Sequence, residues 1–328
     1  MTRMIEPALS SRLAPLAMRV AALLATPLAP LYGLAVAWRL YHPPRPRRRR
    51  APSAFGLHPA ECWINGPSAR SRLHAWHLPG DPDRVVVVGH GMGLDKSHSL
   101  AQAQLAHRAG YTVVLFDFRN HGASFRDHAL TRFSRRFDDD VVAVVDQVRA
   151  MPEHAHARIA LWGFSFSTFP VLDTLARLDG AVHAVICDSG PTRDLSVIVN
   201  SLPRSGLLPV PQVLQAAPAR TLWQAVYRRL ATAMLDPPAD WPPAAQHGVD
   251  RTPMLFVVGD RDAVTPVDQV RAVARRYPYA EVLVMRGAGH LHGIKVDRDA
   301  YAAMVLDFLT RALSKDPVAA PQHTAGGS

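Results

Sequence analysis

Cysteine is scarce in this sequence, which has only Cys62 and Cys187 among its 328 residues. Two cysteines are too few for a disulfide framework, and they do not form the CxxC pairs of a structural zinc site. Cys187 ends an apolar run, which predicts a buried thiol. The chain must therefore be stabilised by an apolar core, for which 48% hydrophobic residues are sufficient.

Acidic residues are almost absent from the first fifty positions, which hold nine arginines and one acid, Glu6. This segment therefore carries +8 of the formal net charge of +10, and the rest of the chain is almost balanced. A nucleic-acid-binding protein more often carries its basic face on the folded domain. We therefore expect no nucleic-acid partner.

Long uncharged apolar runs are absent except at residues 20–38, which are nineteen residues without a charge. About 20 such residues cross a bilayer core as a helix, and Pro27 and Pro30 do not exclude one. Six arginines follow within residues 39–50, so the charge bias places the C-terminal side in the cytoplasm. We expect a membrane-spanning anchor, in the inner membrane if the source is bacterial, with the folded domain in the cytoplasm.

Two other interpretations of this segment stay open. It is also compatible with an amphipathic helix that lies on the membrane or packs on the domain, with its arginines facing anionic lipid. A cleaved signal peptide, with Ala35-Val36-Ala37 as cleavage site, would make the protein secreted or periplasmic, although six arginines after the site would resist export.

The chain divides into five parts. We expect an N-terminal flank (1–19), the transmembrane or interfacial helix (20–38), an Arg/Pro-rich linker (39–54), one folded domain (55–313) with a lid insertion at about 190–250, and a disordered tail (314–328). In the insertion, residues 220–235 form an amphipathic helix. We interpret the insertion as a lid over a hydrophobic site, or alternatively as a packed insertion without a role.

Within the folded domain, short apolar runs alternate with helical patterns. The runs suit strands buried on both faces: 84–88, 112–116, 158–162, 183–187, 254–258 and 281–285. A hairpin of 62–65 and 70–78 precedes them. The helical segments are 97–109, 137–150, 168–178, 267–277 and 298–313, with Asp138 to Asp140 at the N-terminus of the second. The pattern predicts an α/β fold with a mostly parallel sheet covered by helices on both faces.

A nucleophile motif stands at one strand-to-helix turn, where Ser165 follows the run 158–162. A sharp turn of this kind needs small residues two positions before and after the nucleophile. Gly163 meets that need fully and Ser167 only approximately. Ser165 is therefore the candidate nucleophile.

Polar loops follow other strands, and the carboxyl ends of parallel strands share one edge of a sheet. After the first buried strand, Gly89 to Gly93 can aim backbone N–H groups into a site, and we expect the Met92 and Phe166 N–H groups to form an oxyanion hole. His90 and Gly91 would support this loop. The turn 117–124 either braces it or serves folding only, without a catalytic role.

The acid and the base come from the last two strand ends. Asp262 is our candidate acid over Asp260, with Asp188 as a further alternative, because an acid here can orient a histidine. His290 is the candidate base, with His292 as its competitor. A metal site built from His90, His121, His290 and His292 lacks HExxH-type spacing, so we expect neither metal nor cofactor.

Five motifs occur along the chain, and the last three carry the nucleophile, the acid and the histidine in that order. The five motifs are His90 to Gly93, Asp117 to Ser124, Gly163 to Ser167, Gly259 to Pro266 and Gly287 to His290. From about Phe55 to Leu313 the chain resembles the α/β-hydrolase superfamily, most of all its bacterial esterase, lipase and serine-aminopeptidase-like branch. The departures from the pattern are Ser167 at the elbow and Asn120, where glycine is common.

The resemblance implies a serine hydrolase with a Ser165–Asp262–His290 triad that forms an acyl-enzyme. The anchor and the lid favour a small-molecule or lipid-like ester as substrate. A peptidase, a thioesterase, or a non-catalytic membrane-tethered binding protein of the same fold are the alternatives. No sequence feature indicates an oligomeric state.

Overall fold

The computed structural model describes residues 20–45, 50–66, 71–202, 210–245 and 248–314. Its centre is one eight-stranded sheet with the strand order β1-β2-β4-β3-β5-β6-β7-β8. The strands are β1 (Ala60–Asn65), β2 (Arg72–Leu78), β3 (Asp81–Val88), β4 (Tyr111–Phe116), β5 (Arg158–Phe164), β6 (Ala184–Asp188), β7 (Met254–Gly259) and β8 (Ala280–Met285). β1 and β2 are antiparallel to their neighbours, and the other pairs are parallel. The predicted mostly parallel sheet is confirmed.

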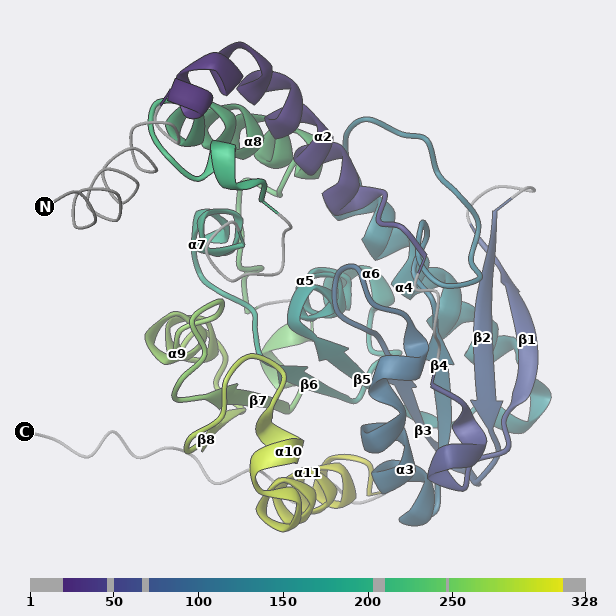
Figure 1. Ribbon diagram of the computed structural model, residues 1–328. Helices are drawn as coiled ribbons and strands as arrows, with labels where there is room; N and C mark the ends of the chain where they lie inside the picture. Colours follow the sequence, from purple (N-terminus) through teal and green to yellow (C-terminus); the bar gives the residue numbers. More distant parts are fainter. Residues whose placement is uncertain (1–19, 46–49, 67–70, 203–209, 246–247, 315–328) are drawn as a thin grey trace, which may run out of the picture.

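The central strands are buried on both faces because helices cover both (Figure 1). Every residue of β4, β6 and β7 is buried, which explains why these strands read as continuous apolar runs. One face packs against α3 (Leu100–Arg108), α10 (Gly293–Val296) and α11 (Arg298–Ala312). The other packs against α4 (Phe133–Ala150), α5 (Thr168–Asp173), α6 (Leu175–Leu178) and α9 (Val267–Ala274).

Two helix boundaries differ from the prediction. α4 begins at Phe133, so Asp138 to Asp140 lie inside the helix and not at its N-terminus. Phe133 and Phe137 extend its apolar stripe toward the N-terminus and are fully buried, which is why the helix starts earlier. The predicted helix 168–178 is two helices, α5 and α6, which meet at Thr174.

The segment between β6 and β7 contains α7 (Leu195–Ser201) and α8 (Ala219–Leu235). α8 confirms the predicted amphipathic helix, with Trp223, Tyr227, Ala231 and Met234 on its buried side. Both helices lie beyond the carboxyl ends of the strands, on the side of the sheet where the polar loops gather (Figure 1).

The N-terminal apolar segment is helical from Val20 to Tyr41, with the short turn η1 (Thr26–Leu28) before α2 (Ala29–Tyr41). Pro27 and Pro30 are tolerated because each lies in the first turn of its helix. The helix runs three residues beyond the predicted end and packs along α8 (Figure 1). The predicted flank 1–19 and tail residues 315–328 lie outside the described residues.

Candidate active site

Ser165 lies at the end of β5, where the chain enters the turn η5 (Ser165–Ser167) and then α5. Its φ of 53° is unusual for a residue with a side chain and is the strained geometry of a nucleophile elbow. A Cβ at Gly163 would lie 2.8 Å from the carbonyl carbon of Ser167. The turn therefore requires glycine at position 163.

Ser167 occupies the elbow position where the sequence departs from the family pattern. Its side chain is fully buried, and its Oγ accepts a hydrogen bond from the Phe164 N–H at 2.6 Å and donates one to the Phe164 carbonyl at 3.1 Å. A Cβ at Gly89 would lie 2.9 Å from this hydroxyl. The side chain of Ser167 therefore fills the interior of the elbow. The absence of a Cβ at Gly89, at the end of the neighbouring strand, leaves the room that this side chain needs.

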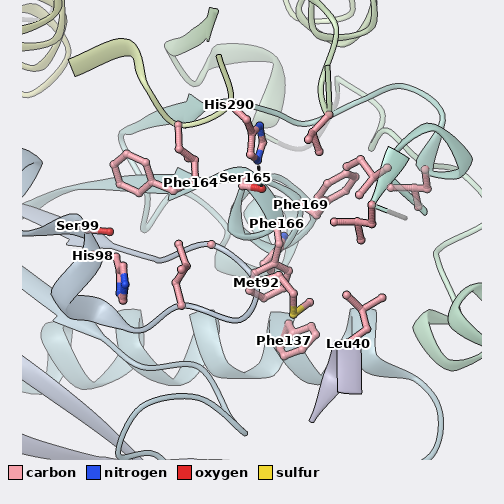
Figure 2. A pocket seen from close by; sticks show the side chains of 18 of the residues that line it. Leu40, Met92, His98, Ser99, Phe137, Phe164, Ser165, Phe166, Phe169 and His290 are labelled. Carbon is pink, nitrogen blue, oxygen red and sulfur yellow. Dashed lines mark hydrogen bonds between the residues drawn. The ribbon is translucent and has the colours of Figure 1, made fainter. Parts of the chain in front are cut away.

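The structure brings the three candidate triad residues together from three loops. The Oγ of Ser165 lies 2.7 Å from Nε2 of His290 (Figure 2), and Nδ1 of His290 lies 2.8 Å from Oδ2 of Asp262. Because Nδ1–H donates to the carboxylate, Nε2 is the acceptor for the serine hydroxyl. This arrangement can move a proton from Ser165 to His290.

The loop after β7 fixes the carboxylate of Asp262 and keeps it ionised. Oδ1 accepts hydrogen bonds from the N–H groups of Val264 and Thr265, both at 2.9 Å, and Oδ2 accepts one from the Thr265 hydroxyl at 2.7 Å. Burial alone would raise the pKa of Asp262, but the hydrogen bonds and the charge of His290 outweigh it and lower the pKa. The carboxylate is thus a charged, immobile partner for the histidine.

The competing candidates have other partners. Asp188 is buried and accepts hydrogen bonds from Tyr301 and from Ser189, whose hydroxyl in turn accepts one from the Leu291 N–H at 2.9 Å. Burial raises the pKa of Asp188 to about 6. Asp260 is exposed and accepts a hydrogen bond from the Gly287 N–H. Asp188 and Asp260 therefore hold the loop of His290 in place without touching the imidazole.

The candidate oxyanion donors come from two segments, the loop after β3 with Met92 and the turn η5 with Phe166. The Met92 N–H has no hydrogen-bond acceptor within the part of the chain that the structure describes. Phe166 is the second residue of η5, and N–H groups in the first turn of a helix have no partner within that helix. Both residues line the same cavity as Ser165 (Figure 2). Two N–H groups are thus available to a carbonyl oxygen bound there.

The loop that carries Met92 is braced by buried histidines. Nε2 of His90 accepts a hydrogen bond from the Phe118 N–H, and Nε2 of His121 accepts one from the Gly93 N–H, both at 3.1 Å. Burial lowers the pKa of each imidazole, to about 3 for His121, so both are neutral acceptors. Of the two interpretations of the turn 117–124, the hydrogen bond from Gly93 supports the brace.

Among the described residues, no group of three His, Cys, Asp or Glu is placed to hold a metal ion.

A cavity of about 670 Å³ opens in front of Ser165. Its wall is mostly apolar, and several parts of the chain contribute to it. Among them are the loop of Gly91 and Met92, the helices α4, α5 and α7, the segment after α8, and the loop of His290. Met92, Phe137, Phe166, Phe169 and His290 are seen around Ser165 in Figure 2. His292 lines the cavity from an exposed position. The space suits an apolar group of a substrate more than a highly charged one.

Sequence reasoning missed two contributions to this cavity. Leu40 and Tyr41, at the end of α2, line it although they precede the expected domain. Asp138, which is buried, and Asp173, which is partly buried, line it as well, and burial in this wall raises the pKa of each carboxyl group. The triplet of aspartates at 138–140 is the sequence signal for the second contribution, but the predicted helix start placed the triplet at the helix N-terminus, where negative charge is favourable in any case.

The comparisons with known proteins identify the family of the chain. Residues 85–304 match the alpha/beta hydrolase family. No curated protein matches the chain.

Three solved structures illustrate the likeness in fold. The esterase Pf2001 from Pyrococcus furiosus superimposes with a TM-score of 0.64 at 19% identity, over 83% of this chain and 100% of its own. An esterase from Thermogutta terrifontis gives 0.57 at 16% identity, over 78% and 100%. The epoxide hydrolase VrEH1 from Vigna radiata gives 0.55 at 16% identity, over 77% and 98%. Since the family match covers more than half of the sequence, the chain belongs to the alpha/beta hydrolase family.

Proposed function

We propose that the protein is a serine hydrolase that cleaves acyl or lipid-like esters through an acyl-enzyme intermediate. The observation that supports this best is the continuous hydrogen-bonded series Ser165–His290–Asp262 in the wall of an apolar cavity. Ser165 is the nucleophile, His290 the base and acid, and Asp262 the group that orients and stabilises the histidine.

In the first half of the reaction, His290 Nε2 takes the proton of Ser165 as Oγ bonds to the ester carbonyl carbon. The carbonyl oxygen becomes negative, and the N–H groups of Met92 and Phe166 stabilise it. The tetrahedral intermediate then expels the alcohol oxygen, which receives the proton from His290. The alcohol leaves and the acyl group stays on Ser165.

In the second half, a water molecule takes the place of the alcohol. His290 removes one proton from it while its oxygen attacks the acyl carbon, and the same two N–H groups again bind the oxyanion. Expulsion of Ser165 Oγ, which regains its proton from His290, releases the carboxylic acid. Asp262 remains ionised throughout and compensates the charge of the imidazolium.

The nucleophile assignment is tested with a fluorophosphonate probe on the full chain. Wild type should be labelled and Ser165→Ala should not. Ser134→Ala is the matched control, because Ser134 lines the same cavity but bonds the Asp236 carbonyl. Absence of label on wild type, or equal labelling of Ser165→Ala, would show that Ser165 is not the nucleophile.

A p-nitrophenyl ester series of increasing acyl length tests the substrate class. The apolar cavity predicts that kcat/KM rises from acetate to medium-chain esters. The peptidase and thioesterase alternatives come from the resemblance to a superfamily that hosts several kinds of acyl transfer. Cleavage of aminoacyl amides without turnover of any ester would exclude the esterase proposal, and hydrolysis of acyl thioesters alone would favour a thioesterase.

Membrane tethering and a cytoplasmic catalytic domain are also proposed. Among the described residues, residues 20–41 form the one helix apolar enough to cross a membrane, with a mean hydropathy of 1.8. A membrane anchor and a signal sequence share this property. A reporter fused after Trp38 should be active in the cytoplasm, whereas a processed N-terminus near Trp38 would identify a signal peptide.

A further inference from the structure

The N-terminal helix has two apolar faces, and only one of them is covered. Ala29, Gly33 and Ala37 are buried against α8. Leu24, Leu28, Leu31 and Leu34, spaced four, three and three residues apart, lie on the other side and are 75%, 62%, 62% and 50% exposed. We name these four residues the leucine stripe. Single exposed leucines are common, but a continuous stripe marks an interaction surface.

The charges around the stripe indicate what covers it. Residues 20–45 contain no acidic residue. Arg39 is exposed at the end of α2, and Arg228 and Arg229 are exposed on the adjacent α8. None of these three arginines forms an ion pair with a carboxylate among the residues that the structure describes. An exposed aliphatic face on a pair of helices, α2 and α8, that carries exposed arginines and no acidic residue is complementary to the surface of an anionic bilayer.

We propose that the leucine stripe inserts into the interface of an anionic membrane, with α2 lying in the membrane plane beside α8. The stripe contacts the acyl boundary and the arginines contact the headgroups. This arrangement develops the interfacial alternative that the sequence left open and differs from the spanning anchor that it favoured.

The contacts of α2 with the folded domain favour the in-plane arrangement. A Cβ at Gly33 would lie 2.5 Å from the Trp223 carbonyl oxygen, so the two helix backbones nearly touch. The Tyr41 hydroxyl donates to the Ala231 carbonyl at 2.7 Å, and Nδ2 of Asn120 donates to the Tyr41 carbonyl at 2.9 Å. If α2 crossed the bilayer in this contact, Arg228 and Arg229 of α8 would enter hydrocarbon, which is costly.

The same arrangement places the cavity at the membrane. Leu40 and Tyr41, in the last turn of α2, form part of its wall. If the proposed esterase function holds, on which this step depends, the substrate is an ester lipid that reaches Ser165 from the bilayer. The leucine stripe itself lies outside the cavity wall.

Vesicle flotation of the full chain tests the surface. The probes are phosphatidylcholine vesicles with and without 30% phosphatidylglycerol, in low and high salt. We expect strong flotation with the anionic vesicles, weakened by salt. The triple variant Leu24→Glu, Leu28→Glu, Leu31→Glu should lose at least about tenfold in partitioning. The matched control is Val296→Glu with Met304→Glu, two exposed apolar residues on α10 and α11 at the opposite end of the molecule.

Two further measurements separate the alternatives. Spin labels at positions 24, 28 and 31 should show one shallow depth, whereas a spanning helix would give depths that change along the chain. If flotation is absent and the stripe variant instead converts a dimer to a monomer, the stripe binds a second copy and the proposal is wrong. Equal flotation of wild type and the triple variant would also overturn it.

An activity measurement keeps this inference separate from the esterase proposal. The triple variant should hydrolyse a soluble short-chain ester like wild type but lose activity toward an ester lipid in anionic vesicles. Flotation without fluorophosphonate labelling would support the surface and contradict the esterase. Fluorophosphonate labelling without flotation would support the serine nucleophile and contradict the membrane surface.

Discussion

Gly33 and Trp223, which are 190 positions apart, pack against each other where α2 meets α8. A Cβ at Gly33 would lie 2.5 Å from the Trp223 carbonyl oxygen and 3.0 Å from the Val226 Cβ. The ring of Tyr32 meets the ring of Trp223 edge to face, with centroids 5.2 Å apart. The N-terminal helix is therefore fitted to the segment between β6 and β7.

This contact predicts that position 33 does not tolerate a side chain. A glycine in a helix normally costs about 0.5–1 kcal/mol relative to alanine, so Gly33→Ala would stabilise a free helix. Here we expect Gly33→Ala to destabilise the protein, and Gly33→Leu to do so by about 1–3 kcal/mol, because the helices must separate. Ala35→Leu, at an exposed position of the same helix, is the control. Denaturant unfolding of the full chain measures both. A more stable Gly33→Ala variant would contradict the packing.

The elbow was predictable from the sequence, whereas the α2–α8 contact was not. Gly163 and Ser165 obey a local rule, in which a sharp turn needs a small residue two positions before the nucleophile. No local rule marks Gly33 in the sequence, because the residue that it contacts, Trp223, is far away along the chain. An apolar helix that packs on one side only has the composition of a membrane helix, so its sequence alone favoured a spanning anchor.

Asn120 shows how a departure from a family pattern can be explained only by tertiary contacts. Its φ of 65° suits glycine or asparagine. The amide group adds what glycine lacks, because it accepts from the Asp127 N–H and donates to the Tyr41 carbonyl. The sequence marked the position as unusual, but its partner at the end of α2 was visible only in the structure.

Ser167 gives a second prediction. Its Oγ is the acceptor for the buried N–H of Phe164, so Ser167→Ala leaves that donor unsatisfied. We expect a loss of about 1–3 kcal/mol in the free energy of unfolding. Fluorophosphonate labelling of Ser165 should persist, since no side-chain atom of Ser167 lines the cavity. Ser196→Ala, on the exposed start of α7, is the control. Unchanged stability of Ser167→Ala would show that the hydroxyl is dispensable for the elbow.

Asp262 provides the third prediction. Asp262→Asn keeps the shape of the side chain but removes the charge that fixes the histidine tautomer, so kcat should fall by about 10⁴. KM should change little, because the carboxylate lies behind His290 and not in the cavity wall. Steady-state kinetics on a soluble ester measures both.

Two matched variants identify the acid. Asp260→Asn, in the same loop but bonded to the Gly287 N–H, should keep most of the activity. Asp188→Asn should lower activity much less than Asp262→Asn, because Asp188 reaches the His290 loop only through Ser189. The opposite result, a loss of about 10⁴ in kcat for Asp188→Asn together with an active Asp262→Asn, would identify Asp188 as the acid.

The fourth prediction concerns the buried Asp138 and the partly buried Asp173, which both line the cavity. Burial, followed by the neighbouring Asp173, raises the pKa of Asp138, and burial raises the pKa of Asp173. In the unfolded chain these groups release their protons near pH 4. As the pH rises above about 4, the folded protein still holds a proton that the unfolded chain has lost, so stability must fall.

Asp138→Asn removes this proton and should flatten the fall in stability. For one proton the slope is at most about 1.4 kcal/mol per pH unit. Urea unfolding between about pH 5 and pH 8 should show a shallower decline for Asp138→Asn than for wild type, and the variant should gain stability relative to wild type as the pH increases. Asp146→Asn, an exposed carboxylate on the same helix, should keep the slope of wild type. Parallel pH profiles of wild type and Asp138→Asn would mean that the pair is ionised in the folded protein and that the cavity wall carries negative charge.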